Sequence, residues 1–237
     1  MIPTITVTGL ALAFLPALLV IALMYRWKAN AATAVYATVR MLGQLLAIGY
    51  VLIYIFESDR WWLIAIVVAV MLSIASWIAI RHLHRKSAAA YFGTLLAISL
   101  PSLLVLALVT RLVIGVEPWF MPRFVVPLAG MIIAGAMNAV GLAAERFQAE
   151  AARGVAYDQA RRTAFEASLI PIINSLFAVG LVALPGMMTG QILSGVSPLI
   201  AAKYQIVVMT MLFGVSGLSS ALYLRLQATK KGPRAGP

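Results

Sequence analysis

Charged residues are scarce in this chain. Only 11% of its 237 residues are Asp, Glu, Lys or Arg and 63% are hydrophobic, whereas soluble domains carry roughly 25% charged residues. This composition excludes a water-soluble fold and predicts an all-α integral membrane protein, with the lipid bilayer as its solvent. The 18 basic residues outnumber the 7 acidic ones, but they lie between long apolar runs instead of forming a patch, so we expect no nucleic-acid partner.

Several chemical motifs are also missing. Cysteine is absent, which excludes disulfides, thiolate metal sites and cysteine nucleophiles. The sequence contains neither a Gly-x-x-x-x-Gly-Lys-Ser/Thr phosphate loop nor a His-Glu-x-x-His metal motif. We therefore expect no catalytic residue and no cofactor in this chain, and any ATP and Mg that power the protein must bind to a partner.

Seven apolar stretches are each long enough to cross a bilayer core of about 30 Å as a helix. They cover approximately residues 4–25, 35–56, 61–80, 92–115, 124–144, 167–186 and 204–224. The sequence thus predicts one transmembrane domain over residues 1–227, with a short polar tail at 228–237.

Basic residues are distributed unevenly among the connections. Thirteen Lys and Arg residues lie on the side reached after the first, third, fifth and seventh stretches, and four lie on the other side. Because Lys and Arg collect in cytoplasmic loops, we expect an N-terminus outside and a C-terminus in the cytoplasm. The expected location is the plasma (inner) membrane, which the chain crosses seven times.

Residues 145–166 form the longest polar stretch, and Gly154 divides it. Apolar residues recur at helical spacing on either side of this glycine, which predicts two short amphipathic helices. Such a pair can dock on a partner protein, or it can simply connect two spans.

Polar residues inside the predicted spans are candidates for a translocation path. Arg40 and Gln44 are four residues apart and share one helix face, where a charge must be paired or hydrated. Alternatively, Arg40 snorkels to the cytoplasmic interface. Asn138 and Asn174 can line the path or hydrogen-bond to a neighbouring helix.

Proline and glycine interrupt the region that follows the sixth stretch. Pro185 and Gly186 begin a still-apolar run that predicts a broken or re-entrant segment serving as a gate; an ordinary external turn is the alternative. Thr189 and Gln191 belong to the same candidate gate. The thioethers of Met187 and Met188 are conceivable soft metal ligands, although methionine also serves as apolar filler.

All seven carboxylates lie in predicted loops or at helix ends. A bare hard cation would therefore find no charged ligand midway across the membrane. This distribution favours a chelated metal or an organic anion near Arg40 as the solute.

Residues 184–198 read LPGMMTGQILSGVSP and are followed by KYQIV at 203–207. This stretch resembles the FetB (YbbM) permease family, and RMLGQL at 40–45 and PLAGMI at 127–132 support the resemblance. The resemblance implies a homodimer of permease chains, a separate FetA-like ATPase and a role in iron export.

Glu150-Ala151-Ala152, with Gly154 close behind, resembles the EAA loop of ABC importer permeases. That resemblance implies contact with the ATPase through residues 145–166, and the residues expected to couple are Phe147, Glu150, Ala151, Gly154, Val155, Tyr157 and Arg161.

The function favoured by the sequence is the permease subunit of an ABC transporter that exports iron or another metal-related solute. An ion-coupled secondary transporter is the alternative, but it would usually need acidic or histidine relays inside the membrane. A membrane-embedded enzyme is a weaker alternative, because no catalytic motif lies within a span.

The predicted orientation can be tested by cysteine labelling, because the chain has no cysteine of its own. We expect Ala156→Cys to react with an impermeant maleimide only after the cells are opened, and Ser58→Cys to react in intact cells. Labelling of Ala156→Cys in intact cells would contradict the orientation.

Overall fold

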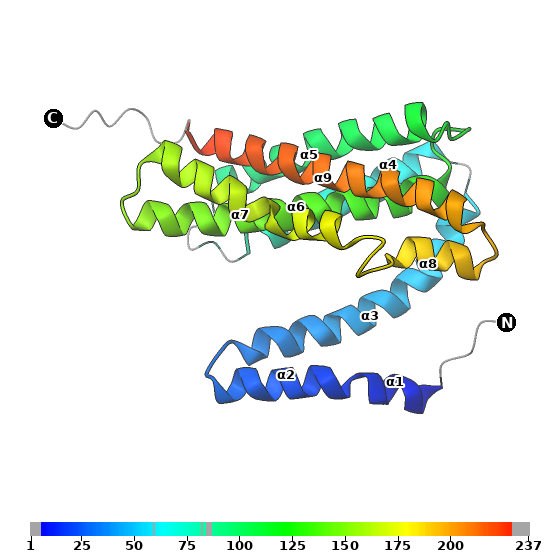
Figure 1. Cartoon of the computed structure of the whole chain (residues 1–237), viewed down its shortest axis with the longest axis horizontal. Coiled ribbons are helices and arrows are strands. Elements are labelled where there is room, and N and C mark those ends of the chain that lie inside the picture. The colour runs from blue at the N-terminus through cyan, green and yellow to red at the C-terminus, as the bar shows by residue number, and fades with distance from the viewer. Residues whose placement is uncertain (1–5, 59, 82, 84–86, 229–237) are drawn as a thin grey trace. The chain divides into compact units, whose positions relative to one another are not determined.

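The computed structural model describes residues 6–58, 60–81, 83 and 87–228 (Figure 1). These residues are helical apart from their connections, and their one β-pairing is an isolated bridge between Val179 and Ala183. The all-α prediction is confirmed. Most of the predicted tail, with Lys230, Lys231 and Arg234, lies outside the described residues, as do Arg85 and Lys86.

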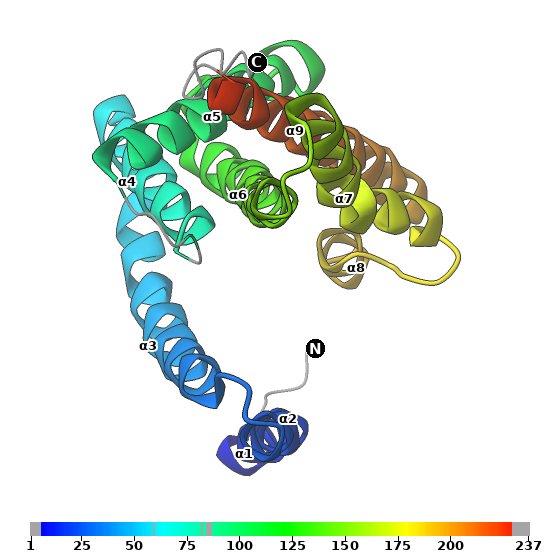
Figure 2. The ribbon, with the colours of Figure 1, turned by 90° about the vertical axis from the view of Figure 1, so that its left-hand side faces the viewer.

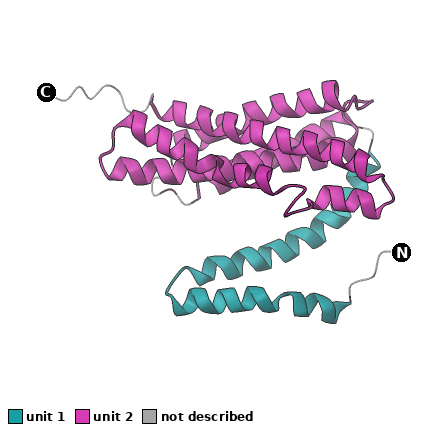
Figure 3. Ribbon diagram, viewed as in Figure 1, with its two compact units in different colours: residues 1–58 teal, residues 59–237 magenta. Residues whose placement is uncertain are grey.

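The chain divides into two compact units, Met1–Ser58 and Asp59–Pro237 (Figure 3). Unit 1 contains α1 (Val7–Ala13), α2 (Leu15–Arg26) and α3 (Ala31–Phe56). Pro16, near the start of α2, has no amide hydrogen to continue the α1 ladder, and the helix is interrupted at Phe14. Whether both units form the single domain predicted over residues 1–227 stays a prediction.

Unit 2 holds the remaining helices. Their bounds are α4 (Trp61–Ala79), α5 (Ala88–Ala107), the π-helical turn η1 (Leu108–Val113), α6 (Pro122–Ala152), α7 (Tyr157–Ala178), α8 (Gly186–Leu193) and α9 (Pro198–Ala228). Ser87 begins α5 by accepting a hydrogen bond from the Ala90 amide at 3.1 Å, as an N-cap residue does.

Helix α6 is the centre of unit 2 and contacts α4, α5, α7 and α9 (Figure 2). Its buried positions include five alanines, of which Ala136, Ala143 and Ala144 are completely buried. The facing part of α9 is also rich in small residues, with Ser219 and Ser220 completely buried. Small side chains let helix backbones approach closely in a membrane, where packing replaces the hydrophobic effect as the source of association.

Six helices in the described residues are long and apolar enough to cross a membrane. They coincide with the first five predicted stretches and the last one. The predicted span at 167–186 differs, because the helix there begins earlier, carries Arg161, Arg162 and Glu166 in its first half, and ends at Ala178. Apolar composition alone did not reveal that this stretch leaves the helix before it is long enough to span.

Helices α7 and α9 run antiparallel. The hydroxyl of Tyr157, the first residue of α7, donates a hydrogen bond to the carbonyl of Leu224 near the end of α9 at 2.9 Å. At its other end, α7 shares a cavity with residues 202–210 of α9. The chain from α7 through α8 therefore follows α9 from its C-terminal end toward its N-terminal end.

The prediction of two short helices over residues 145–166 is wrong in one respect. Helix α6 continues without a break to Ala152, and α7 starts at Tyr157 and continues to Ala178, so the two pieces are the ends of long helices. No proline or glycine between 145 and 152 stops α6, and Pro171 inside α7 is accommodated. Only residues 153–156 form the connection.

The packing of α6 predicts that a larger side chain at its buried face destabilises unit 2. We expect Ala136→Leu to lower the free energy of unfolding by about 1–3 kcal/mol, because a packed interior cannot accept added methylenes without strain. Ala134→Leu is the matched control, because Ala134 is exposed on the same helix. The stability of both variants is measured as the melting temperature of the purified protein in detergent. Equal melting temperatures for Ala136→Leu and Ala134→Leu would contradict the central role of α6.

Candidate functional site

The segment between α7 and α8 breaks the helical backbone. Val179 leaves the helix with extended φ and ψ, and Gly180 adopts a positive φ of 82°, a conformation that favours glycine. The amide of Gly180 donates to the carbonyl of Ala183 at 3.0 Å. The interruption expected at Pro185 and Gly186 thus starts at Val179, and these two residues begin α8 instead.

Thr189 closes this break. Its hydroxyl donates to the carbonyl oxygens of Leu184 at 3.4 Å and Pro185 at 3.2 Å. The Pro185 carbonyl also accepts from the Thr189 amide at 3.0 Å. The hydroxyl therefore matters mainly for the Leu184 carbonyl, because an unpaired carbonyl costs free energy in an apolar environment.

A cavity of about 340 Å³ lies beside the break, between the end of α7, α8 and the first half of α9. Its walls are mainly apolar, with a thioether from Met188 and another from Met209. The lining residues are Leu176, Val179, Gly180, Met188, Ala202, Gln205, Ile206, Met209 and Thr210. A mostly apolar cavity with few polar groups has the composition of a small-molecule site.

Two amide side chains in this region have unsatisfied oxygens. Gln205 lines the cavity and is only 4% exposed, and its Oε1 has no hydrogen-bond partner among the described residues. Oε1 of Gln191 on α8 is also buried without such a partner. A buried acceptor left unpaired costs about 1–3 kcal/mol, which marks both oxygens as places for a ligand or water.

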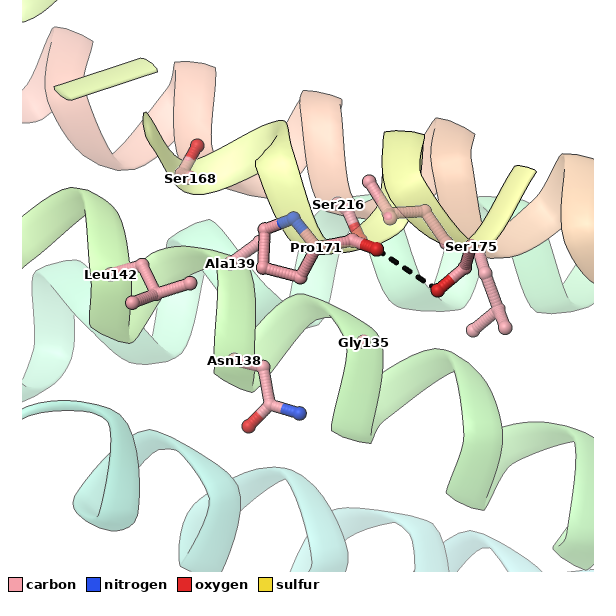
Figure 4. Close-up of a pocket in the computed structure, with 10 residues that line it drawn as sticks. Gly135, Asn138, Ala139, Leu142, Ser168, Pro171, Ser175 and Ser216 are labelled. Atoms are coloured by element: carbon pink, nitrogen blue, oxygen red, sulfur yellow. Dashed lines mark hydrogen bonds between the residues drawn. The ribbon is translucent and has the colours of Figure 1, made fainter. Parts of the chain in front are cut away.

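A second cavity of about 150 Å³ lies between α6, α7 and α9 (Figure 4). Asn138 of α6 lines it together with Ser168 and Ser175 of α7 and Ser216 of α9. The Ser175 hydroxyl already donates to the Pro171 carbonyl at 2.9 Å, as the dashed line in Figure 4 shows. The structure therefore places Asn138 at a mainly apolar cavity that these three serines also line.

Arg40 and Gln44 lie together on α3 in unit 1. With the Gln44 amide oriented so that its oxygen faces the guanidinium, this oxygen accepts from Nε of Arg40 at 3.2 Å and from Nη2 at 3.3 Å. The predicted i, i+4 pair is thus a hydrogen-bonded pair, and Arg40 is half-buried.

Other predicted residues are not gathered at either cavity. Asn174 is exposed on α7, and Met187 does not line the cavity that Met188 lines. The described residues contain no group of three or more His, Cys, Asp or Glu side chains that could hold a metal ion. A metal role for Met187 and Met188 stays a prediction.

The turn between α6 and α7 joins the residues expected to couple with an ATPase. Gly154 has a φ of 77°, and the amide of Val155 donates to the Glu150 carbonyl at 3.2 Å, which is the glycine-dependent Schellman end of a helix. The Phe147 and Tyr157 rings meet edge to face with centroids 5.8 Å apart.

Charged side chains make contacts within each of the two helix ends. Glu150 is only 7% exposed, and its carboxylate lies 2.7 Å from Arg146 and 3.7 Å from Arg153. Arg161 stacks over the Tyr157 ring at 5.4 Å, and Ala151 is half-buried beside the turn. These contacts each stay within one helix end, and the Phe147–Tyr157 ring pair joins the two ends into one hairpin.

Comparison with known proteins identifies the family of this chain. The family described as "Uncharacterised protein family (UPF0014)" matches residues 7–230, which is almost the whole chain. This chain belongs to the UPF0014 family. The predicted resemblance to FetB is confirmed, because this UPF0014 protein is 34% identical over 236 residues to the "Probable iron export permease protein FetB" of Escherichia coli, covering 92% of this chain and 89% of that protein.

Two further relatives are similar. A UPF0014 membrane protein of Synechocystis is 37% identical over 198 residues, with 76% of each chain covered. The protein ALUMINUM SENSITIVE 3 of Arabidopsis thaliana is 33% identical over 205 residues, covering 78% of this chain and 72% of that protein. No solved structure matches. With six candidate spans and relatives named as membrane proteins, this UPF0014 protein is a multi-pass membrane protein.

Sequence reasoning missed Gln205 and the three serines of the smaller cavity. The predicted last span begins at 204 and so leaves Gln205 at its edge, whereas α9 begins at Pro198 and places Gln205 two turns inside the helix. An amide one turn or more inside an apolar helix is the signal that could have identified it. Serine gives no such signal, because its hydroxyl can bond to its own helix.

The unpaired oxygen of Gln205 leads to a prediction about the stability of the folded protein. We expect Gln205→Leu to raise the free energy of unfolding by about 1 kcal/mol, because an apolar side chain of similar size removes the buried, unpaired oxygen. Gln227→Leu, near the end of the same helix, should change little. A lower melting temperature of the Gln205→Leu protein in detergent would show that the amide already has a partner.

Proposed function

We propose that this protein is the membrane-spanning subunit of an ABC transporter that exports iron or another metal-related solute. Two permease chains would form a homodimer, and a separate FetA-like ATPase would bind ATP and Mg. The absence of a phosphate loop in the sequence and the permease name of the E. coli relative support this proposal. The observation on which it depends most is the interruption of the helical backbone between α7 and α8, beside the cavity that Gln205 lines. We call this interrupted passage of α7 and α8 the broken crossing.

The broken crossing also supports an odd number of passages through the membrane. The end of α6 and the end of α9 lie at the same end of unit 2, because Phe147 and Leu224 both contact Tyr157. The chain must therefore return to the opposite end before α9 begins. In the proposed topology α7, the break and α8 make this passage together, with the N-terminus outside and the C-terminus in the cytoplasm.

A break at membrane depth suits a translocation path. Backbone groups outside a helix cannot face lipid, and they are tolerated where they line a cavity or are covered by protein. The break at 179–185 has its own short hydrogen bonds and adjoins the cavity with Gln205 and Met188. In our proposal this segment is the gate, and the two glutamine oxygens accept hydrogen bonds from the passing solute.

The lining residues limit the form of the solute. None of the residues lining either cavity is acidic, and a bare divalent cation in an apolar site would have no compensating charge. A metal carried in a complex whose charge its own ligands balance is compatible with these walls. The proposed solute is accordingly a chelated metal, which fits the predicted role of Arg40 in receiving an anionic group.

The hairpin formed by the ends of α6 and α7 is the proposed contact with the ATPase. Because α7 is continuous from Tyr157 to Ala178, a displacement of the hairpin moves the helix that ends at the break. Closure of two ATPases on ATP would thus be transmitted along α7 to the gate, as a rigid-body movement.

The proposed coupling depends on the shape of the turn at Gly154. We expect Gly154→Val to weaken association with the ATPase roughly tenfold, because a β-branched residue resists the positive φ and would reshape the turn. Gly214→Val on α9 is the control, because nothing lies within 4 Å of the added Cβ there. Affinity is measured by titrating the purified ATPase onto the permease in nanodiscs, and an unchanged value for Gly154→Val would place the contact elsewhere.

The proposal as a whole is tested by purifying the chain with the nucleotide-binding subunit encoded by a neighbouring gene. We expect a stable complex whose ATP hydrolysis in liposomes is stimulated by an iron chelate, and Gln205→Leu should remove the stimulation while leaving the complex intact. Failure of the two chains to associate would reject the transporter-subunit function. Transport driven by an ion gradient without the ATPase would instead establish a secondary transporter.

A further inference from the structure

A groove of about 410 Å³ lies between α7 and α9, at the end where α7 begins and α9 ends. Three guanidinium groups line it, from Arg161 and Arg162 on α7 and Arg225 on α9. The remaining lining residues are apolar, namely Phe165, Ala221 and Leu224. The groove is therefore amphipathic, with arginines beside an apolar wall.

The three arginines differ in how their charge is balanced. Arg161 lies 3.2 Å from the Asp158 carboxylate, and Nε of Arg162 donates to Glu166 at 2.9 Å. The hydrogen bond to Glu166 raises the pKa of the Arg162 guanidinium. Arg225 forms no ion pair with any residue that the structure describes. Arg225 is thus the guanidinium available to an external anion.

The position of the groove along α9 limits the class of ligand that it can bind. It lies at the end of α9, a candidate span whose last turn contains Arg225, so the arginines belong near the headgroup region and the apolar wall near the first acyl carbons. An anionic phospholipid has this division of polarity, with a phosphate next to hydrocarbon. Basic pockets between membrane helices bind such headgroups, and guanidinium binds phosphate oxygens in a bidentate manner.

We infer that this groove binds the phosphate of an anionic phospholipid, with Arg225 as its main ligand. A free inorganic phosphate could use the same guanidinium groups, but it would gain nothing from the wall formed by Phe165 and Leu224. An acidic segment of a protein partner would likewise use the charges and leave the apolar wall uncovered. The apolar wall is what favours a lipid.

A lipid in this groove would join α7 to α9 beside the Tyr157–Leu224 hydrogen bond. It would therefore stabilise the end of unit 2 that carries the α6–α7 hairpin. The inference goes beyond the proposed function and needs only that the chain resides in a membrane, so it can fail while association with an ATPase succeeds.

The test uses the whole chain, purified in detergent and titrated with phosphatidylglycerol, with phosphatidylcholine as the uncharged comparison. Melting temperature and the lipid adducts seen by native mass spectrometry are the two measurements. We expect phosphatidylglycerol to raise the melting temperature and to bind selectively. Arg225→Gln should weaken its binding about tenfold, the effect of losing a hydrogen bond to a charged group, and Arg225→Lys should retain part of it.

Arg123→Gln is the matched control, because Arg123 is an exposed arginine near the start of α6 and does not line the groove. Equal binding of phosphatidylcholine, or full binding of phosphatidylglycerol by Arg225→Gln, would overturn the inference. Stabilisation by inorganic phosphate equal to that by phosphatidylglycerol would also overturn it, in favour of a soluble anion. If Arg225→Gln does not fold, Arg225→Lys takes its place, and undiminished selectivity of that variant for phosphatidylglycerol is the overturning result, because an ammonium cannot replace the bidentate guanidinium.

Discussion

Backbone hydrogen bonding in lipid is the constraint on which the rest of this structure depends. Water is absent from the bilayer core, so each crossing must satisfy its own amides and carbonyls. Six helices are long and apolar enough to cross a membrane, and each satisfies its backbone groups through its own helical hydrogen bonds. In the proposed topology the chain after Ala178 meets it differently, through short bonds such as Gly180 to Ala183 and the Thr189 hydroxyl. A break of this kind needs neighbouring protein, and α9 lies beside its first residues, Val179 and Gly180, whereas Leu181 and Val182 are exposed in the single chain.

Close packing among α6, α7 and α9 is what places α9 beside α7. Alanines on α6 and serines on α9 are completely buried, and small side chains allow these helices to approach each other. Helix α7 packs against both of them. The two cavities arise where this packing is least complete, at the middle and at the end of α7. The core of unit 2 and the candidate path therefore share the same three helices.

Polar groups in unit 2 are divided between two environments. Several hydroxyls and the Gln205 amide are buried between the helices, and Gln205 and Gln191 keep oxygens without a partner among the described residues. Charged groups gather at the end formed by the α6–α7 hairpin and the last turn of α9, where Glu150 is paired with two arginines and Arg225 is not paired among described residues. Neutral polar groups suit a path through apolar walls, and the charged end suits contacts with a partner or with lipid headgroups.

The sequence by itself determined the properties that act over a few residues. Apolar length located the six candidate spans, Gly154 marked the turn between two helices, and the run starting at Pro185 and Gly186 indicated an interrupted helix near its observed place. Tertiary structure alone decided where α7 ends, that the hairpin continues α6 and α7, and that Gln205 and Met209 face the same cavity as Met188. These features depend on which helices pack together. Hydrophobic periodicity, in a chain that is apolar on nearly every face, carries too little contrast to specify those neighbours.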